Sequence, residues 1–178
     1  MGTALEVGVI FLLVLVNGAF AMSELAIVSS RRSRLMALQR RGSLGAEAAL
    51  ALADDPQRFL PTVQVGITLV GIFAGAFGGA RLSGTLGEAI SVVPLLAPYA
   101  NEIAFTLVVI VITYLSIILG ELVPKQVALR NPERVAVIVA RPMAALSRFS
   151  APVVWVLGKS SGVVLRLFGP AVPGEQSV

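Results

Sequence analysis

Residues 103–121, IAFTLVVIVITYLSIILGE, indicate the fold class of this 178-residue chain. They form a nearly pure run of Ile, Val, Leu and Phe that ends in Gly120 and Glu121. About 20 such residues, folded as a helix, cross the roughly 30 Å apolar core of a bilayer. Residues 5–28 and 59–80 are two further apolar runs of similar length, and the second carries no charge. We therefore predict an all-α integral membrane protein with three transmembrane helices.

The composition agrees with a membrane protein and limits its chemistry. Hydrophobic residues make up 56% of the chain and charged residues 13%, against about 45–50% and about 25% in soluble domains. The absence of Cys and His excludes disulfides, thiolate nucleophiles, Cys/His zinc sites and imidazole bases. No nucleophile stands with a base, so we expect no enzyme. Any metal site must use oxygen ligands, and the length predicts one domain over residues 1–178.

The distribution of basic residues predicts the orientation. The segment between the first two runs is rich in arginine, at Arg31, Arg32, Arg34, Arg40, Arg41 and Arg58. The segment between the second and third runs has one basic residue, Arg81, with Glu88 and Glu102. Because cytoplasmic loops carry the excess of Lys and Arg, we expect the N-terminus outside and the C-terminus inside. These basic residues flank apolar runs, so we expect no nucleic-acid partner.

Residues 122–169 have a different pattern. Arg134, Arg141 and Arg148 recur every seven positions, and Pro142 and Pro152 interrupt the apolar sequence. This spacing predicts short amphipathic helices that form a juxtamembrane belt at the cytoplasmic interface, with basic side chains on lipid headgroups. The alternative is a fourth span over residues 149–168, which would bury Lys159 at a cost of a few kcal/mol. The sequence does not decide between three and four spans.

Polar side chains occur at similar depths in all three runs. Ser23 and Glu121 lie about 18 residues from the outer ends of their helices, roughly 27 Å deep at 1.5 Å per residue. Gln64 and Thr68, in the antiparallel second helix, reach the same half of the bilayer. We therefore expect a polar cluster between the three helices near the cytoplasmic side, although Ser23 could instead bond back to its own helix.

The sequence after the third run frees a backbone oxygen for this cluster. Pro124 has no N–H, so it cannot bond the carbonyl of Gly120 four residues earlier. That carbonyl lies beside the carboxylate of Glu121. Hydroxyl, amide, carbonyl and carboxylate oxygens suit a hard cation such as Mg²⁺, Ca²⁺ or Na⁺. The alternative for Glu121 is an ion pair with a nearby Lys or Arg.

Structural roles are the alternative for the remaining polar residues. Ionisable side chains inside spans are costly and need partners. For Glu24 we favour a structural ion pair with Arg31 or Lys125. Asn17 and Gln64 could bind a ligand or simply hold helices together, as buried amides often do.

Three strings resemble, in order and spacing, the transmembrane domain of the CNNM/CorC (HlyC/CorC) magnesium transporter family. They are residues 17–35, NGAFAMSELAIVSSRRSRL, residues 59–79, FLPTVQVGITLVGIFAGAFGG, and residues 118–136, ILGELVPKQVALRNPERVA. The resemblance covers about residues 5–169. It implies a homodimer of three-span subunits in the cell membrane that exports Mg²⁺ coupled to Na⁺. It also implies cytoplasmic CBS domains after the membrane domain; this chain contains none, which suggests a membrane-domain fragment or a short paralogue.

The resemblance also implies a metal site. The matching ligands are Ser23, Gly120 and Glu121, and the third motif continues with Pro124 and Lys125. The polar stretch of the second helix supplies candidates for an additional site together with the first helix: Asn17, Gln64, Gly66 and Thr68.

Two positions depart from the family pattern. Many members have a serine where this chain has Ala21, and an asparagine where it has Ile67. A dehydrated Mg²⁺ needs six ligands, so other oxygens or water must substitute, or the cargo is a different cation. The first hypothesis is Mg²⁺ export. The others are export of another cation such as a polyamine, and a membrane anchor or regulatory module that transports nothing.

Overall fold

The computed structural model describes residues 3–167, and these residues are helical almost throughout, with no β-strand among them. The long helices are α1 (Thr3–Ser29), α4 (Pro56–Ser91) and α5 (Ala100–Ile117), the last continued by a π-helical turn η2 (Ile118–Leu122) and α6 (Val123–Arg130). The other elements are α2 (Arg32–Arg40), α3 (Leu44–Asp54), the 3₁₀ turn η1 (Ala97–Tyr99), α7 (Pro132–Phe149) and α8 (Ala151–Leu167). The predicted all-α fold class is confirmed.

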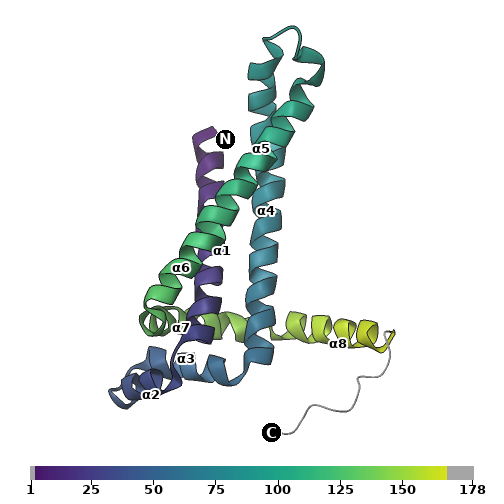
Figure 1. Cartoon of the computed structure of the whole chain (residues 1–178). Helices are drawn as coiled ribbons and strands as arrows, with labels where there is room; N and C mark the ends of the chain where they lie inside the picture. Colours follow the sequence, from purple (N-terminus) through teal and green to yellow (C-terminus); the bar gives the residue numbers. More distant parts are fainter. Residues whose placement is uncertain (1–2, 168–178) are drawn as a thin grey trace.

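Three helical segments are long and apolar enough to span a membrane: Thr3–Ser29, Pro56–Ser91 and Ala97–Arg130. Helices α7 and α8 would add a fourth if counted as one broken span, because together they pass the same test but meet at a bend of 65°. The long helices stand side by side, and α2, α3, α7 and α8 lie across one end of them (Figure 1). We call these four helices the basal layer.

The second span is longer than the sequence predicted. The apolar run stops at residue 80, but α4 continues to Ser91. Leu82 and Leu86 in this extension pack against a small core formed by Ile10, Ala74, Val108 and Ile112. The helix ends before Pro94 and Pro98, whose rings cannot continue it.

The third span is shared between two neighbours. Its first half, α5, packs on α4, whereas η2 and α6 pack on α1 (Figure 1). The outward faces of the spans carry exposed large apolar side chains, including Leu12, Ile72, Phe73 and Ile110. Exposed apolar surface on this scale is unusual for a soluble monomer and is expected where lipid surrounds the helices.

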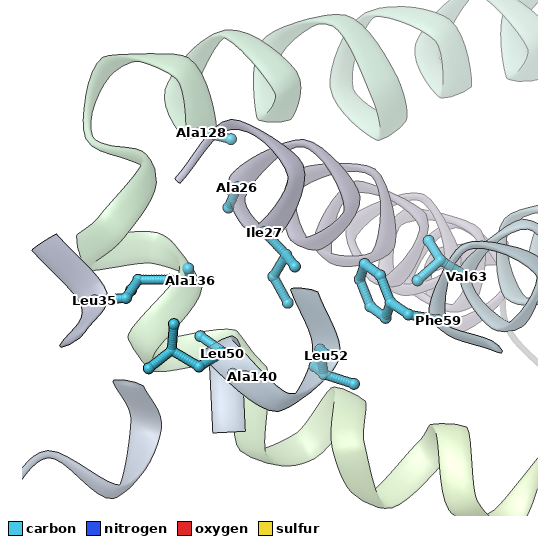
Figure 2. Packing of buried hydrophobic residues seen from close by; sticks show 11 residues of the cluster. Ala26, Ile27, Leu35, Leu50, Leu52, Phe59, Val63, Ala128, Ala136 and Ala140 are labelled. Atoms are coloured by element: carbon cyan, nitrogen blue, oxygen red, sulfur yellow. The ribbon is translucent and has the colours of Figure 1, made fainter. Parts of the chain in front are cut away.

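The larger hydrophobic core lies where the spans meet the basal layer. Ile27 of α1, Phe59 and Val63 of α4, Leu50 of α3 and Ala136 of α7 converge there (Figure 2). Each of these residues is at most 7% exposed. This core holds the C-terminal end of α1 and the N-terminal end of α4 against α3 and α7.

Helix α3 begins and packs for identifiable reasons. The Ser43 hydroxyl accepts a hydrogen bond from the Ala46 N–H at 3.2 Å, which caps the helix start. Gly45 then lies directly against the backbone carbonyl of Val137 in α7, and a Cβ at this position would overlap that carbonyl. Glycine is therefore required for α3 and α7 to pack at this distance.

Glu133 ties the start of α7 to the turn between α1 and α2. Its carboxylate accepts a hydrogen bond from the backbone N–H of Arg31 at 3.4 Å and pairs with the Arg34 guanidinium at 3.5 Å. Burial alone would raise the pKa of Glu133. Its own backbone N–H, that of Arg31 and the charge of Arg34 outweigh this effect and hold the pKa below its usual value.

Candidate functional site

The π-helical turn η2 interrupts the third span and frees two backbone carbonyls. The N–H of Val123 bonds the carbonyl of Ile118, five residues earlier, instead of Leu119. The five-residue partner of Leu119 would be Pro124, which has no N–H, so the Leu119 carbonyl lacks both regular helical donors. The Gly120 carbonyl has lost its four-residue donor to the same proline. The sequence predicted the second of these freed carbonyls and missed the first.

Asn17 of α1 satisfies one of these carbonyls. Its side-chain Nδ2 donates to the Gly120 carbonyl at 3.2 Å, across the contact between α1 and η2. Asn17 is only 8% exposed. Because a carbonyl accepts and cannot donate, the NH₂ group must face Gly120, and this fixes which way the amide points.

The other half of the Asn17 amide has no partner. Among the residues that the structure describes, Asn17 Oδ1 is the one buried side-chain polar atom that has no hydrogen-bond partner. An unmet buried acceptor costs roughly 1–3 kcal/mol. Such atoms are exceptional in native structures, so this oxygen is a candidate contact for a group that the described residues do not supply.

Two glycines allow α1 and η2 to approach this closely. A Cβ on Gly18 would lie 2.9 Å from Pro124 Cγ and 3.0 Å from the Leu119 carbonyl oxygen. A Cβ on Gly120 would lie 3.1 Å from Asn17 Nδ2. Side chains here would push the helices apart and break the contact between Asn17 and the turn. The sequence analysis did not single out Gly18, although its place beside Asn17 was the available signal.

Glu121 forms an ion pair within its own helix. Lys125 Nζ lies 2.7 Å from Glu121 Oε1, and the two side chains are 33% and 46% exposed, respectively. The alternative predicted for Glu121, an ion pair with a nearby basic residue, is therefore what the structure contains. Glu24 is partly buried and forms no ion pair within residues 3–167, so the predicted pair with Arg31 or Lys125 is wrong.

Ser23 is fully buried and turned toward its own helix. Its hydroxyl donates to the carbonyl of Ala19, one turn earlier. This is the local bond that the sequence analysis gave as the alternative to ligation. The hydroxyl oxygen still has lone pairs with which to accept a hydrogen bond or bind a cation.

The predicted polar residues of the second span lie on two different faces. Gly66 faces α1, because a Cβ there would lie 2.8 Å from the ring of Phe20. Gln64 and Thr68 are exposed and line an open groove of about 610 Å³ between α4 and α8. The structure therefore brings Asn17 to Gly120, but it directs Gln64 and Thr68 toward α8.

The polar atoms at the contact between α1 and η2 are mostly neutral oxygens. No group of three or more His, Cys, Asp or Glu residues that could hold a metal occurs among the described residues. What the contact between α1 and η2 offers is an amide oxygen and two backbone carbonyls, while the carboxylate of the next residue, Glu121, is partly exposed and paired with Lys125. Such a set can bind a cation or an N–H donor.

An all-helical bundle with three segments long and apolar enough to cross a membrane, one of them broken by a π-helical turn, defines an α-helical membrane protein. Residues 8–178 match the family described as "Cyclin M transmembrane N-terminal domain", and the chain belongs to this family. The resemblance expected from the three sequence motifs is thereby confirmed.

Three relatives illustrate the breadth of the match. The UPF0053 protein sll0260 of Synechocystis sp. is 51% identical over 165 residues, which is 93% of this chain and 37% of that protein. The "Polyamine export protein" of Haemophilus influenzae is 31% identical over 159 residues, covering 88% and 36% of the two chains. The UPF0053 protein YhdP of Bacillus subtilis is 29% identical over 166 residues, covering 93% and 37%.

The chain thus spans little more than a third of the length of each of these relatives. Together with the apolar spans, the family indicates a membrane protein.

Proposed function

We propose that this chain is the membrane domain of a cation exporter of the cell membrane, with Mg²⁺ as the cargo and Na⁺ as the coupling ion. The observation that carries the proposal is the unpartnered, buried Oδ1 of Asn17 beside the freed carbonyls of η2. Irregular backbone and polar side chains at membrane depth are tolerated where they line a path for a polar solute. The family resemblance supplies Mg²⁺ as the specific cargo.

In this proposal Glu121 provides the charge of the cation site. Ser23, the carbonyl of Gly120 and Oδ1 of Asn17 complete it, and Lys125 acts as an internal counter-ion that holds the carboxylate when no cation is present. Mg²⁺ requires six oxygens and keeps several waters when the protein offers fewer. The chain has Ala21 and Ile67 where many family members have polar side chains, so we expect water to fill those positions.

The proposed orientation places the basal layer in the cytoplasm. Arg134, Arg141 and Arg148 of α7 are all exposed and can contact anionic lipid headgroups. The amphipathic helices α7 and α8 then form the juxtamembrane belt, with α8 along the interface. The chain acts as a homodimer, as the resemblance implies.

A polyamine is the second candidate cargo. It is favoured by the ligand set, because neutral acceptors with a single carboxylate suit an ammonium group, which brings its own N–H donors and does not need six oxygens. One relative carries the name "Polyamine export protein".

Flux through sealed vesicles tests these alternatives. We expect the reconstituted chain to move Mg²⁺, followed with an entrapped Mg²⁺ dye, faster than protein-free liposomes. Glu121→Gln should abolish this flux, whereas Glu47→Gln should retain it, because Glu47 is an exposed carboxylate of α3 outside the spans. Flux of radiolabelled spermidine without flux of Mg²⁺ would replace the first cargo by the second. Absence of both fluxes would refute transport and leave a membrane anchor.

A further inference from the structure

A small pocket at the junction of α3, α4 and α7 contains a buried hydroxyl that the structure does not use. The pocket has a volume of about 160 Å³, and Arg58 at the start of α4 and Ser147 near the end of α7 line it. Ser147 is only 5% exposed, yet its hydroxyl forms no hydrogen bond with any of residues 3–167. Other helical serines, such as Ser23 and Ser160, bond back to their own helix. The Ser147 hydroxyl is therefore available to a group in the pocket.

Two arginines of this pocket are available as well. Neither Arg58 nor Arg148 takes part in an ion pair within the part of the chain that the structure describes. Arg148 Nε donates to the Ala144 carbonyl at 3.4 Å, which leaves the two terminal nitrogens of its guanidinium free. The acid of the pocket, Asp55, caps α4 by accepting the backbone N–H of Arg58 at 3.2 Å. Two guanidiniums and a hydroxyl form a set of donors that suits the oxygens of a phosphate group.

An apolar groove between α3 and α7 adjoins the pocket. The groove has a volume of about 900 Å³ and shares Ala51, Ala144 and Arg148 with the pocket. Leu44 and Ile138 line it and are 62% and 74% exposed, respectively. Large apolar side chains beside a set of anion-binding donors suit a ligand that carries both a phosphate group and a hydrocarbon chain.

The charge and the position of the groove indicate which amphiphile this is. Arg141 and Glu47 also line the groove, so that three arginines and two acids surround the pocket and groove together. Helices α7 and α8 lie across one end of the spans (Figure 1). In the orientation proposed above they lie at the cytoplasmic interface, where anionic phospholipids supply a phosphate group and acyl chains, and where basic pockets bind such headgroups.

We propose that α3, α4 and α7 form a binding site for one anionic phospholipid. Its phosphate lies between Arg58, Ser147 and Arg148, and an acyl chain covers Leu44 and Ile138. The lipid joins the start of α4 to the end of α7, directly before the bend into α8. This site deepens the headgroup contact proposed for α7 and rests on the proposed function only for the leaflet that supplies the lipid.

Thermal unfolding of the purified chain in detergent tests the site without measuring transport. Helical circular dichroism is followed with dioctanoyl phosphatidylglycerol, with phosphatidylcholine of the same chains, with glycerol 3-phosphate and with a glutamate-rich peptide. At a phosphatidylglycerol concentration about ten times the dissociation constant we expect Tm to rise by about 3–6 °C. The other three probes should give a smaller rise. An equal or larger rise with any of them would overturn the proposal, in favour of nonspecific lipid, a soluble phosphate compound or a protein partner, respectively.

A pair of arginine variants separates a defined site from diffuse attraction to a basic helix. Arg148→Gln removes one charge from the pocket and should lose most of the rise in phosphatidylglycerol. Arg134→Gln is the matched control, because it removes the same charge from an exposed position of α7 that lines neither the pocket nor the groove. It should keep most of the rise. Equal losses in the two variants would overturn the site.

Ser147→Ala tests the pocket without a change of charge. Loss of a hydrogen bond to a charged phosphate should weaken the apparent affinity for phosphatidylglycerol about tenfold or more. Ser160→Ala is the control, because the Ser160 hydroxyl is exposed and bonds the Val156 carbonyl. Wild-type affinity in Ser147→Ala would also overturn the site. Absence of Mg²⁺ and spermidine flux together with an intact lipid response would reject the proposed exporter and leave this site standing.

Discussion

Replacing Gly18 by alanine should separate α1 from the π turn. The new Cβ would lie 2.9 Å from Pro124 Cγ and 3.0 Å from the Leu119 carbonyl oxygen. Comfortable contacts between such atoms are about 3.5–4.0 Å. Neither neighbour can turn aside, because one belongs to a closed ring and the other to the backbone. The helices must therefore move apart by about 0.5–1 Å.

The structure allows the energy of this movement to be worked out. The Asn17 to Gly120 hydrogen bond, at 3.2 Å, would stretch beyond hydrogen-bonding range and lose about 0.5–1.5 kcal/mol. Overpacking costs about 1–3 kcal/mol, and alanine regains about 1 kcal/mol over glycine within a helix. The net loss is about 2 kcal/mol, which lowers Tm by about 4–8 °C in a domain of this size.

The measurement is the Tm of the two proteins in the same detergent by circular dichroism. Gly71→Ala is the matched control: it is the same change in a membrane-spanning helix, where a Cβ would have no neighbour within 4 Å. We expect this control to leave Tm unchanged or to raise it. If Gly18→Ala proves as stable as Gly71→Ala, then α1 and η2 do not approach each other as closely in the protein as the structure shows. The candidate site built on that approach would then fail as well.

Two further predictions concern the basal layer. Glu133→Gln should lower Tm at pH 7, because it removes the charge that Arg34 and the Arg31 N–H stabilise. Since the folded pKa of Glu133 is lowered, this stabilisation is complete above its usual pKa of about 4.3 and disappears as pH falls through the folded value, so the Tm difference should shrink as pH falls below about 4.3. A difference that stays constant from pH 7 to pH 3 would contradict this. Gly45→Ala should lower the free energy of unfolding by about 2–4 kcal/mol, because the new Cβ overlaps the Val137 backbone carbonyl. Limited proteolysis should then cut faster between α2 and α3. An unchanged rate of cleavage would contradict the packing of α3 on α7.

The fold followed from the sequence where local composition decides it. Three apolar runs identified three spans, because only helices of that length satisfy their own backbone in lipid. The sequence underestimated α4, whose extension past Arg81 depends on Leu82 and Leu86 meeting side chains of α1 and α5. Tertiary contacts of this kind leave no local pattern. The sequence also did not decide whether residues 149–168 continue the preceding helix, and the structure places a bend at Ser150, between α7 and α8.

For the candidate site, the chemistry of single residues was predictable and their partners were not. Pro124 requires a freed carbonyl at Gly120 wherever the helix goes. That Asn17 would donate to this carbonyl depends on how α1 crosses the third span, which the sequence does not contain. The same holds for Gln64 and Thr68: their depth was predictable, but whether they face α1 or α8 depends on the rotation of α4 about its axis.

The shared third span has a mechanical consequence. Its first half packs on α4 and its second half on α1, and the two halves join at η2. A tilt of α1 against α4 would therefore act on this turn. A π turn holds one residue more than an α-helical turn would at that place, so tightening it would rotate α6 by about 100° about its axis. We therefore expect the two halves of the third span to rotate relative to each other at η2, and the hydrogen bond from Asn17 to Gly120 to oppose that rotation.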